Sequence, residues 1–143
     1  MGQRDSVIAD VLQLQRYQAP DFFAVTGDLI QAAMGPRGTK ELERSIEEAT
    51  GKSATTAMTA VTETLEDMEV KKVAVGTPHR DDQNEHVRGY QEAAGLEVTA
   101  ISGYHTNSHG EIHALREDTP YEKGKEVFLA APGAEAVYLS CPL

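Results

Sequence analysis

The sequence has few of the residues that stabilise secreted domains or bind nucleic acids. It contains one cysteine, Cys141, and no tryptophan among 143 residues. A single thiol cannot form an internal disulfide, which excludes a disulfide-stapled fold and suits a reducing compartment. Thirteen Lys and Arg residues stand against 23 Asp and Glu, giving a formal net charge of −10. That balance argues against nucleic acid as a partner.

Long apolar runs are missing as well. No stretch approaches the ~20 consecutive apolar residues that a membrane span needs. The N-terminal residues Met-Gly-Gln-Arg-Asp lack the apolar core of a signal peptide. We therefore expect a cytoplasmic protein with no membrane partner. The composition, 40% hydrophobic and 25% charged, is that of a globular protein.

The stretch at residues 70–79 organises the chain. Its apolar run at 73–75 has no helical period and ends in a Gly-Thr-Pro loop, which is typical of a buried parallel strand. The Asp81-Asp82 pair caps a following helix, Gly95 ends it, and residues 96–101 form the next strand. A third strand ends on Cys141. We predict an α/β fold with mostly parallel sheets, and the order 96–101, 71–76, 136–140 in the second one.

The first half reads as a partial copy of the same architecture. We predict a helix from Ser6 to near Gln18, a strand at 21–26, a loop at 35–38 and a helix from Thr39 to 50. Residues 52–56 are too short to classify and are compatible with a brief strand leading into a helix cap. A helix with an apolar stripe at 58–68 follows. We place a boundary at 68/69, which gives a first lobe at 1–68 and a second at 69–143.

The loops that follow the strands carry the residues with chemistry. They lie at 25–27, 76–79, 105–109 and 140–142, and the carboxyl ends of parallel strands meet at one edge of a sheet. A thiol there can act in catalysis, and hydroxyls with backbone amides can hold a carboxylate. A cysteine that ends a strand is also often a buried small hydrophobe. Three histidines, 105, 109 and 113, have metal-like spacing, but without a continuous helix or carboxylates we expect neither metal nor cofactor.

Three segments together resemble a known group of enzymes. Residues 50–58 read TGKSATTAM, 71–79 read KKVAVGTPH and 136–141 read AVYLSC. The chain resembles the maleate isomerase and arylmalonate decarboxylase branch of the aspartate/glutamate racemase superfamily. The resemblance implies two α/β lobes with a cofactor-independent site between them, acting on a small dicarboxylate. It assigns the catalytic role to Cys141 and substrate contacts to the following residues: Thr26, Gly27, Thr77, His79 and His109.

The chain departs from the family pattern at several positions. The family's first-lobe cysteine falls on Val25, so chemistry with two thiols is unavailable, and the remaining single thiol matches the arylmalonate decarboxylases. A family tyrosine is His79 here, and Pro142, after the cysteine, has no backbone N–H. Two hypotheses stay open: an isomerase or decarboxylase that works through Cys141, and a non-catalytic relative that binds a carboxylate ligand or a partner protein.

The resemblance also bears on the surface of the protein. Family members begin with a strand before the helix at Ser6 and continue beyond the second cysteine. We therefore expect two incomplete lobes. Apolar surface would then be exposed or covered in a homo-oligomer.

Overall fold

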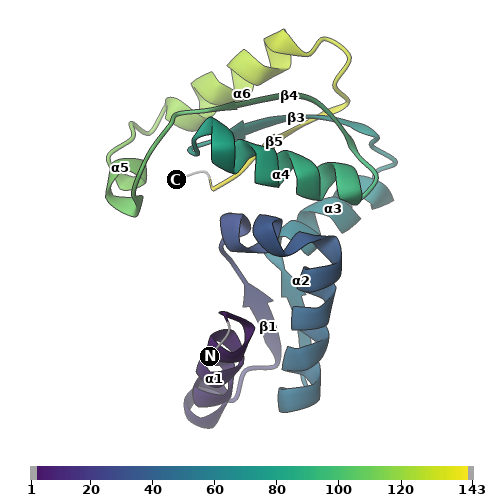
Figure 1. Cartoon of the computed structure of the whole chain (residues 1–143), viewed down its shortest axis with the longest axis vertical. Helices are drawn as coiled ribbons and strands as arrows, with labels where there is room; N and C mark the ends of the chain where they lie inside the picture. Colours follow the sequence, from purple (N-terminus) through teal and green to yellow (C-terminus); the bar gives the residue numbers. More distant parts are fainter. Residues whose placement is uncertain (1–2, 142–143) are drawn as a thin grey trace.

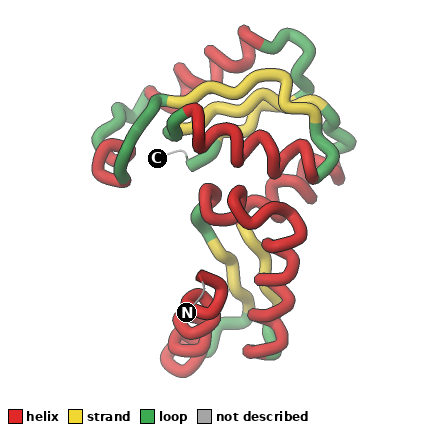
Figure 2. The backbone as a smooth tube through the Cα atoms, in the orientation of Figure 1, coloured by secondary structure: helices red, strands yellow, loops and turns green. Residues whose placement is uncertain are grey.

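The computed structural model describes residues 3–141, which build two parallel sheets with helices around them (Figures 1 and 2). The first sheet pairs β1 with β2, and Val25 stands opposite Thr56 at its end. The elements of this part are α1 (Gln3–Gln18), β1 (Phe22–Val25), α2 (Asp28–Thr50), β2 (Ser53–Thr56) and α3 (Ala57–Asp67). The brief strand considered at 52–56 is thus present, and Thr56 caps α3 by accepting a hydrogen bond from the amide of Thr59.

The second sheet has the predicted strand order, β4-β3-β5, with all pairs parallel. Its strands are β3 (Lys72–Thr77), β4 (Glu97–Gly103) and β5 (Ala136–Leu139), and its helices are α4 (Asp81–Ala93), α5 (His109–His113) and α6 (Thr119–Ala130). The predicted fold class, α/β with mostly parallel sheets, is confirmed.

Alternation along β3 explains how helices cover both faces of this sheet. Val73 and Val75 pack in one cluster with Val87 of α4, whereas Ala74 packs with Val127 of α6. Successive side chains of a strand point to opposite faces, so large residues meet α4 and small ones meet α6. Figure 1 shows α4 and α6 on opposite sides of the strands.

The predicted loop at 35–38 is wrong, because α2 continues through it with a kink. Gly35 has φ 71 and ψ 169, a backbone conformation that glycine adopts readily and other residues rarely adopt. Pro36 begins the next helical stretch. Glycine and proline therefore break the helical geometry at one residue without opening a loop.

Three helices begin earlier than predicted. Helix α1 begins at Gln3, before the expected cap at Ser6. Arg80 stands at the N-cap position of α4, one residue before the expected cap at Asp81. For α6, Thr119 followed by Pro120 predicts a cap at residue 119, and the structure places Asp118 at that position instead. Differences of this size are usual at helix ends.

One hydrophobic cluster joins helices α2 and α3 to the second sheet. It contains Ala32 of α2, Met58 and Leu65 of α3, and Val73 and Val75 of β3, each at most 8% exposed. The division at 68/69 therefore stays a proposal, since the two parts share a core.

No helix within residues 3–141 is long and apolar enough to cross a membrane. Large apolar side chains are exposed on α1, β1 and α6: Leu14, Tyr17, Phe22, Tyr121, Phe128 and Leu129. The homo-oligomer stays a prediction.

Backbone hydrogen bonds fasten the loop after β3 to the loop after β4. Tyr104 donates to the carbonyl of Thr77, His105 to that of His79 and Thr106 to that of Pro78, at 3.2, 3.2 and 3.0 Å. A Cβ on Gly103 would collide with the carbonyl oxygen of His79 and lie 2.9 Å from Nδ2 of Asn84. The close approach of these loops therefore requires glycine at this position.

We predict that Gly103→Ala lowers the free energy of unfolding by about 3 kcal/mol, since the His79 backbone must move. Urea denaturation measures the change. Gly89→Ala is the matched control: nothing lies within 4 Å of its Cβ, and alanine in a helix should add up to about 1 kcal/mol of stability. Equal stability of the two variants would contradict the tight loop contact.

Candidate functional site

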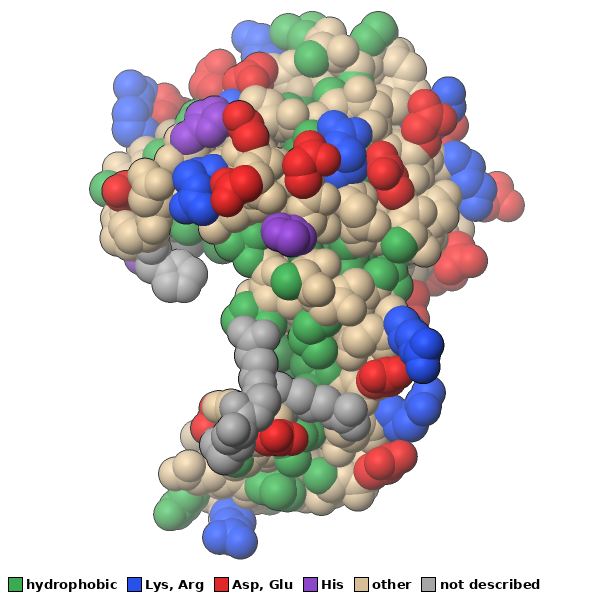
Figure 3. Space-filling view, in the orientation of Figure 1, with side chains coloured by type: hydrophobic (Ala, Val, Ile, Leu, Met, Phe, Trp, Pro, Cys, Tyr) green, Lys and Arg blue, Asp and Glu red, His purple; other side chains and the backbone are tan. Residues whose placement is uncertain are grey.

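A hollow of about 340 Å³ opens where the start of α2 meets the loops of the second sheet. We call it the Cys141 hollow. Figure 3 shows the molecule narrowing between its two parts, with hydrophobic side chains on both sides of the notch. Residues 27–30 line the hollow from one side, and the second sheet contributes His79, Gln83, Thr106, Asn107, Ser108, Ile112 and Cys141.

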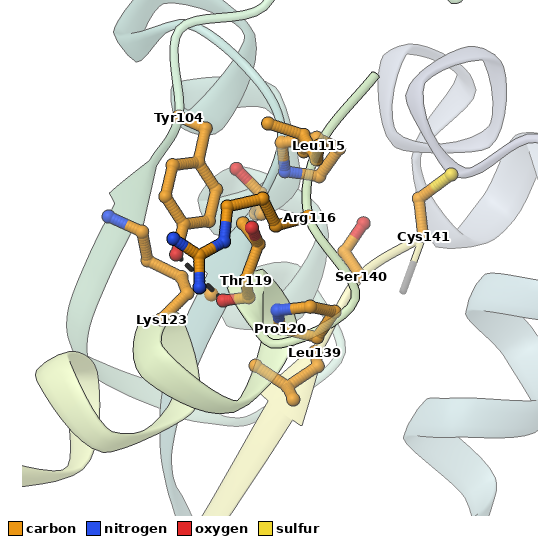
Figure 4. Close-up of a pocket in the computed structure, with 12 residues that line it drawn as sticks. Tyr104, Leu115, Arg116, Thr119, Pro120, Lys123, Leu139, Ser140 and Cys141 are labelled. Atoms are coloured by element: carbon orange, nitrogen blue, oxygen red, sulfur yellow. Dashed lines mark hydrogen bonds between the residues drawn. The ribbon is translucent and has the colours of Figure 1, made fainter. Parts of the chain in front are cut away.

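Cys141 lies two residues after the end of β5, directly after Ser140. Its backbone has a left-handed conformation with φ 47. Few non-glycine residues adopt that conformation, and such strain is concentrated at functional sites. The residue is exposed. Its sulfur points away from Lys123 and Tyr104 (Figure 4). The strained turn thus directs the thiol away from the α6 side of the sheet.

The buried carboxylate of Asp28 holds the centre of the site. One oxygen, Oδ1, accepts a hydrogen bond from the amide of Leu29 at 2.9 Å. The other, Oδ2, lies 3.1 Å from Nε2 of His79 and accepts a hydrogen bond from the hydroxyl of Ser140. Asp28 is 9% exposed, and His79 and Ser140 are 3% exposed each. Because an ionised carboxylate only accepts, Nε2 of His79 carries the proton in this pair.

Sequence reasoning missed Asp28. The available signal was its position directly after Gly27, one of the strand-end residues singled out, at the beginning of a helix.

Thr77 is tied to its own loop. Its hydroxyl donates to Oδ1 of Asn84 at 2.6 Å and accepts the amide of His79 at 3.0 Å. Thr77 and Asn84 are both buried. This arrangement fixes the loop that presents His79, and Thr77 supports the site rather than presenting a free hydroxyl in this state.

The other predicted site residues divide between several places. Gly27, His79 and Cys141 line the Cys141 hollow. Thr26 lines a separate hollow with Val25 and Val7. The backbone of His109 begins α5, but its side chain lies outside the described part of the structure, as does Pro142.

Val25, the position matched to the family's first-lobe cysteine, does not line the Cys141 hollow. Val25 packs against the cluster of Val11, Phe23, Leu42 and Ile46, inside the first part of the chain. Gly27, two residues later, is the residue of this loop that reaches the Cys141 hollow. The strand was expected over 21–26, but β1 ends at Val25, so Gly27 lies in the loop that follows the strand.

A second, smaller hollow of about 30 Å³ lies on the other side of Cys141, next to α6. Its lysine, Lys123, is fully engaged: Nζ donates to Ser102 Oγ, the carbonyl of Gly103 and Glu126 Oε2 at 3.1, 3.3 and 2.8 Å. The same ammonium lies 4.3 Å from the centroid of the Tyr104 ring, whose hydroxyl donates to the carbonyl of Thr119 (Figure 4). The space holds about one water molecule, so the larger hollow is the candidate site.

The charge distribution of the larger hollow favours a neutral thiol. Cys141 is exposed as a residue, but partial burial of its thiol, and then the negative charge of Asp28, raise the pKa of this group. Among the described residues that line the hollow there is no Lys or Arg. No group of three metal-ligating side chains gathers within residues 3–141. A protonated Cys141 can therefore donate a proton and is a poor nucleophile.

Comparison with known proteins agrees with this geometry. A family model described as arylmalonate decarboxylase matches residues 5–142. The chain is 26% identical over 137 residues to an arylmalonate decarboxylase from Bordetella bronchiseptica, covering 96% of this chain and 57% of that protein. A crystal structure of arylmalonate decarboxylase superposes with TM-score 0.88 at 26% identity, over 97% of this chain and 60% of the other.

The fold extends to a second enzyme. A mutant maleate cis-trans isomerase from Nocardia farcinica, with a covalently bound succinylcysteine intermediate, superposes with TM-score 0.82 at 20% identity, over 93% of this chain and 55% of that one. The chain thus spans under two thirds of the length of these relatives. The family match nevertheless covers nearly all of the present sequence, and the chain belongs to the arylmalonate decarboxylase family.

Proposed function

We propose that this protein catalyses a cofactor-independent reaction on a small carboxylic acid, in which Cys141 donates a proton to the carbon next to a carboxylate. The observation that carries the proposal is that Cys141 lines one hollow together with the buried pair of His79 and Asp28. Family membership supports the reaction type. The predicted substrate class is a small dicarboxylate.

The proposed step for a malonate-type substrate balances without a cofactor. The bond between the α-carbon and one carboxyl carbon breaks, and its electron pair stays on the substrate as an enediolate. Carbon dioxide leaves, the Cys141 thiol gives its proton to the α-carbon, and the resulting thiolate recovers a proton from water. Hydrogen-bond donors in the hollow would stabilise the negative charge that develops.

The raised pKa of Cys141 favours this reaction over an isomerase-type addition. Addition of sulfur to a double bond needs a thiolate, whereas protonation of an enediolate needs a thiol. Decarboxylase-type chemistry is therefore our first choice within the family.

A non-catalytic carboxylate-binding protein is the second candidate. The observation that favours it is Asp28, whose side chain already occupies the donors of His79 and Ser140. A carboxylate at this place repels a second one. Binding without turnover would distinguish this candidate from the enzyme.

We predict that Cys141→Ala lowers the rate of turnover by at least about 100-fold, the contribution of a general acid. Proton NMR in D₂O with phenylmalonate, alkylmalonates and maleate measures product and deuterium incorporation. Met68→Ala, at an exposed position on the far end of α3, should retain the wild-type rate. Turnover that survives in Cys141→Ala would remove the thiol from the mechanism. Calorimetric binding with no turnover in the wild type would select the second candidate.

A second prediction concerns the titration of Cys141. Its alkylation by iodoacetamide should have a pH midpoint above about 8.5, the value of an ordinary thiol. Asp28→Asn should lower the midpoint, since one of its two causes is removed, and Asp21→Asn, an exposed carboxylate elsewhere, should leave it unchanged. A wild-type midpoint at or below the ordinary value would indicate an activated thiolate and favour nucleophilic chemistry.

A further inference from the structure

We propose that Asp28 is an internal ligand of a carboxylate-binding cradle, so that small dicarboxylates bind the native hollow more weakly than they bind a hollow without the Asp28 side chain. The cradle consists of the Leu29 amide, Nε2 of His79 and the hydroxyl of Ser140. This inference rests on the proposed function only in taking the Cys141 hollow as the substrate site.

The three donors are arranged as a bound carboxylate requires. They come from three separate segments: the start of α2, the loop after β3 and the residue after β5. The Leu29 amide donates to Oδ1 of Asp28, and His79 and Ser140 donate to Oδ2. Both carboxylate oxygens of Asp28 are therefore hydrogen-bonded. Two of the donors belong to side chains that are 97% buried, since His79 and Ser140 are 3% exposed each. Buried donors of this kind need an acceptor, and here the protein supplies its own.

The occupant stands inside the hollow that would receive the substrate. Asp28 and Cys141 line the same space, and Asp28 is close enough to contribute to the raised pKa of the thiol. The hollow has no Lys or Arg among its described lining residues. A molecule with two carboxylates would therefore place a second negative charge near Asp28 with no cation to compensate for it.

Removal of the Asp28 side chain should convert the cradle into a site for an added carboxylate. Asp28→Ala removes one carboxylate group, which formate replaces in size. Asp28→Gly removes a CH₂–COO⁻ unit, which acetate replaces. In both variants the Ser140 hydroxyl and the His79 N–H lose their acceptor, and a small carboxylate would restore it.

The test combines thermal unfolding and calorimetry on the full chain. At about ten times the dissociation constant, formate should raise the Tm of Asp28→Ala by about 4–5 °C, and acetate should do the same for Asp28→Gly. Malonate should stabilise both variants more strongly than it stabilises the wild type. Asp21→Ala, which makes the same charge change at an exposed site bonded to Lys52, should behave as the wild type does.

Several outcomes would overturn the proposal. One is a folded Asp28→Ala or Asp28→Gly whose Tm does not respond to any of the three carboxylates. Another is wild-type protein that malonate stabilises as strongly as it stabilises the variants. If both variants fail to fold, Asp28→Asn, which keeps a hydrogen-bond acceptor and removes the charge, takes their place: malonate that stabilises Asp28→Asn no more than the wild type overturns the proposal. A variant that folds only when formate or acetate is added supports the cradle. Because every readout is binding, failure of catalysis by Cys141 leaves this result intact, and the two proposals fail separately.

Discussion

The burial of the Asp28 carboxylate is the constraint on which the site depends. A buried carboxylate is costly unless hydrogen bonds and nearby donors replace its water. Here the Leu29 amide is local, but His79 and Ser140 belong to the second sheet. The first part of the chain can therefore satisfy this carboxylate fully only when the second part is docked against it. The shared cluster around Met58 and Val75 supplies the apolar side of the same contact.

This polar contact also sets the chemistry available to the thiol. The loop that carries His79 is fixed by Asn84 through Thr77 and by the backbone of residues 104–106. Ser140 is held by Asp28, and the next residue turns into a left-handed conformation that places Cys141 at the hollow. The negative charge of Asp28 adds to partial burial in raising the pKa of the thiol. A raised pKa suits proton donation and disfavours attack by sulfur.

The second sheet could be predicted from the sequence because its signals are local. The apolar run of β3, its Gly-Thr-Pro exit and the N-cap region of α4 determine a βαβ unit, and the strand order follows from short right-handed connections. The presence of His79 and Cys141 at the carboxyl edge follows from the same topology. The pairing of Asp28 with Ser140, 112 residues apart, has no local signal.

The first part of the chain was harder to predict for two physical reasons. Its strands have four residues each, so an error in where β1 ends exchanges Val25, which belongs to the core, with Gly27, which reaches the hollow. A glycine followed by a proline marks a loop as readily as a kink, and only the packing of α2 against α4 and β2 decides between them. Periodicity gives the type of an element more reliably than its ends.

The most direct test of the central contact is the protonation of His79. Nitrogen-15 NMR of histidine-labelled protein at neutral pH, with the signal assigned by His79→Gln, reports which ring nitrogen carries hydrogen. The account predicts that Nε2 of His79 is protonated and protected from exchange, and that Asp28→Ala removes this protection. An unprotonated Nε2 in the wild type, or protection that is unchanged in Asp28→Ala, would contradict the hydrogen bond between Asp28 and His79 that joins the two parts of the chain.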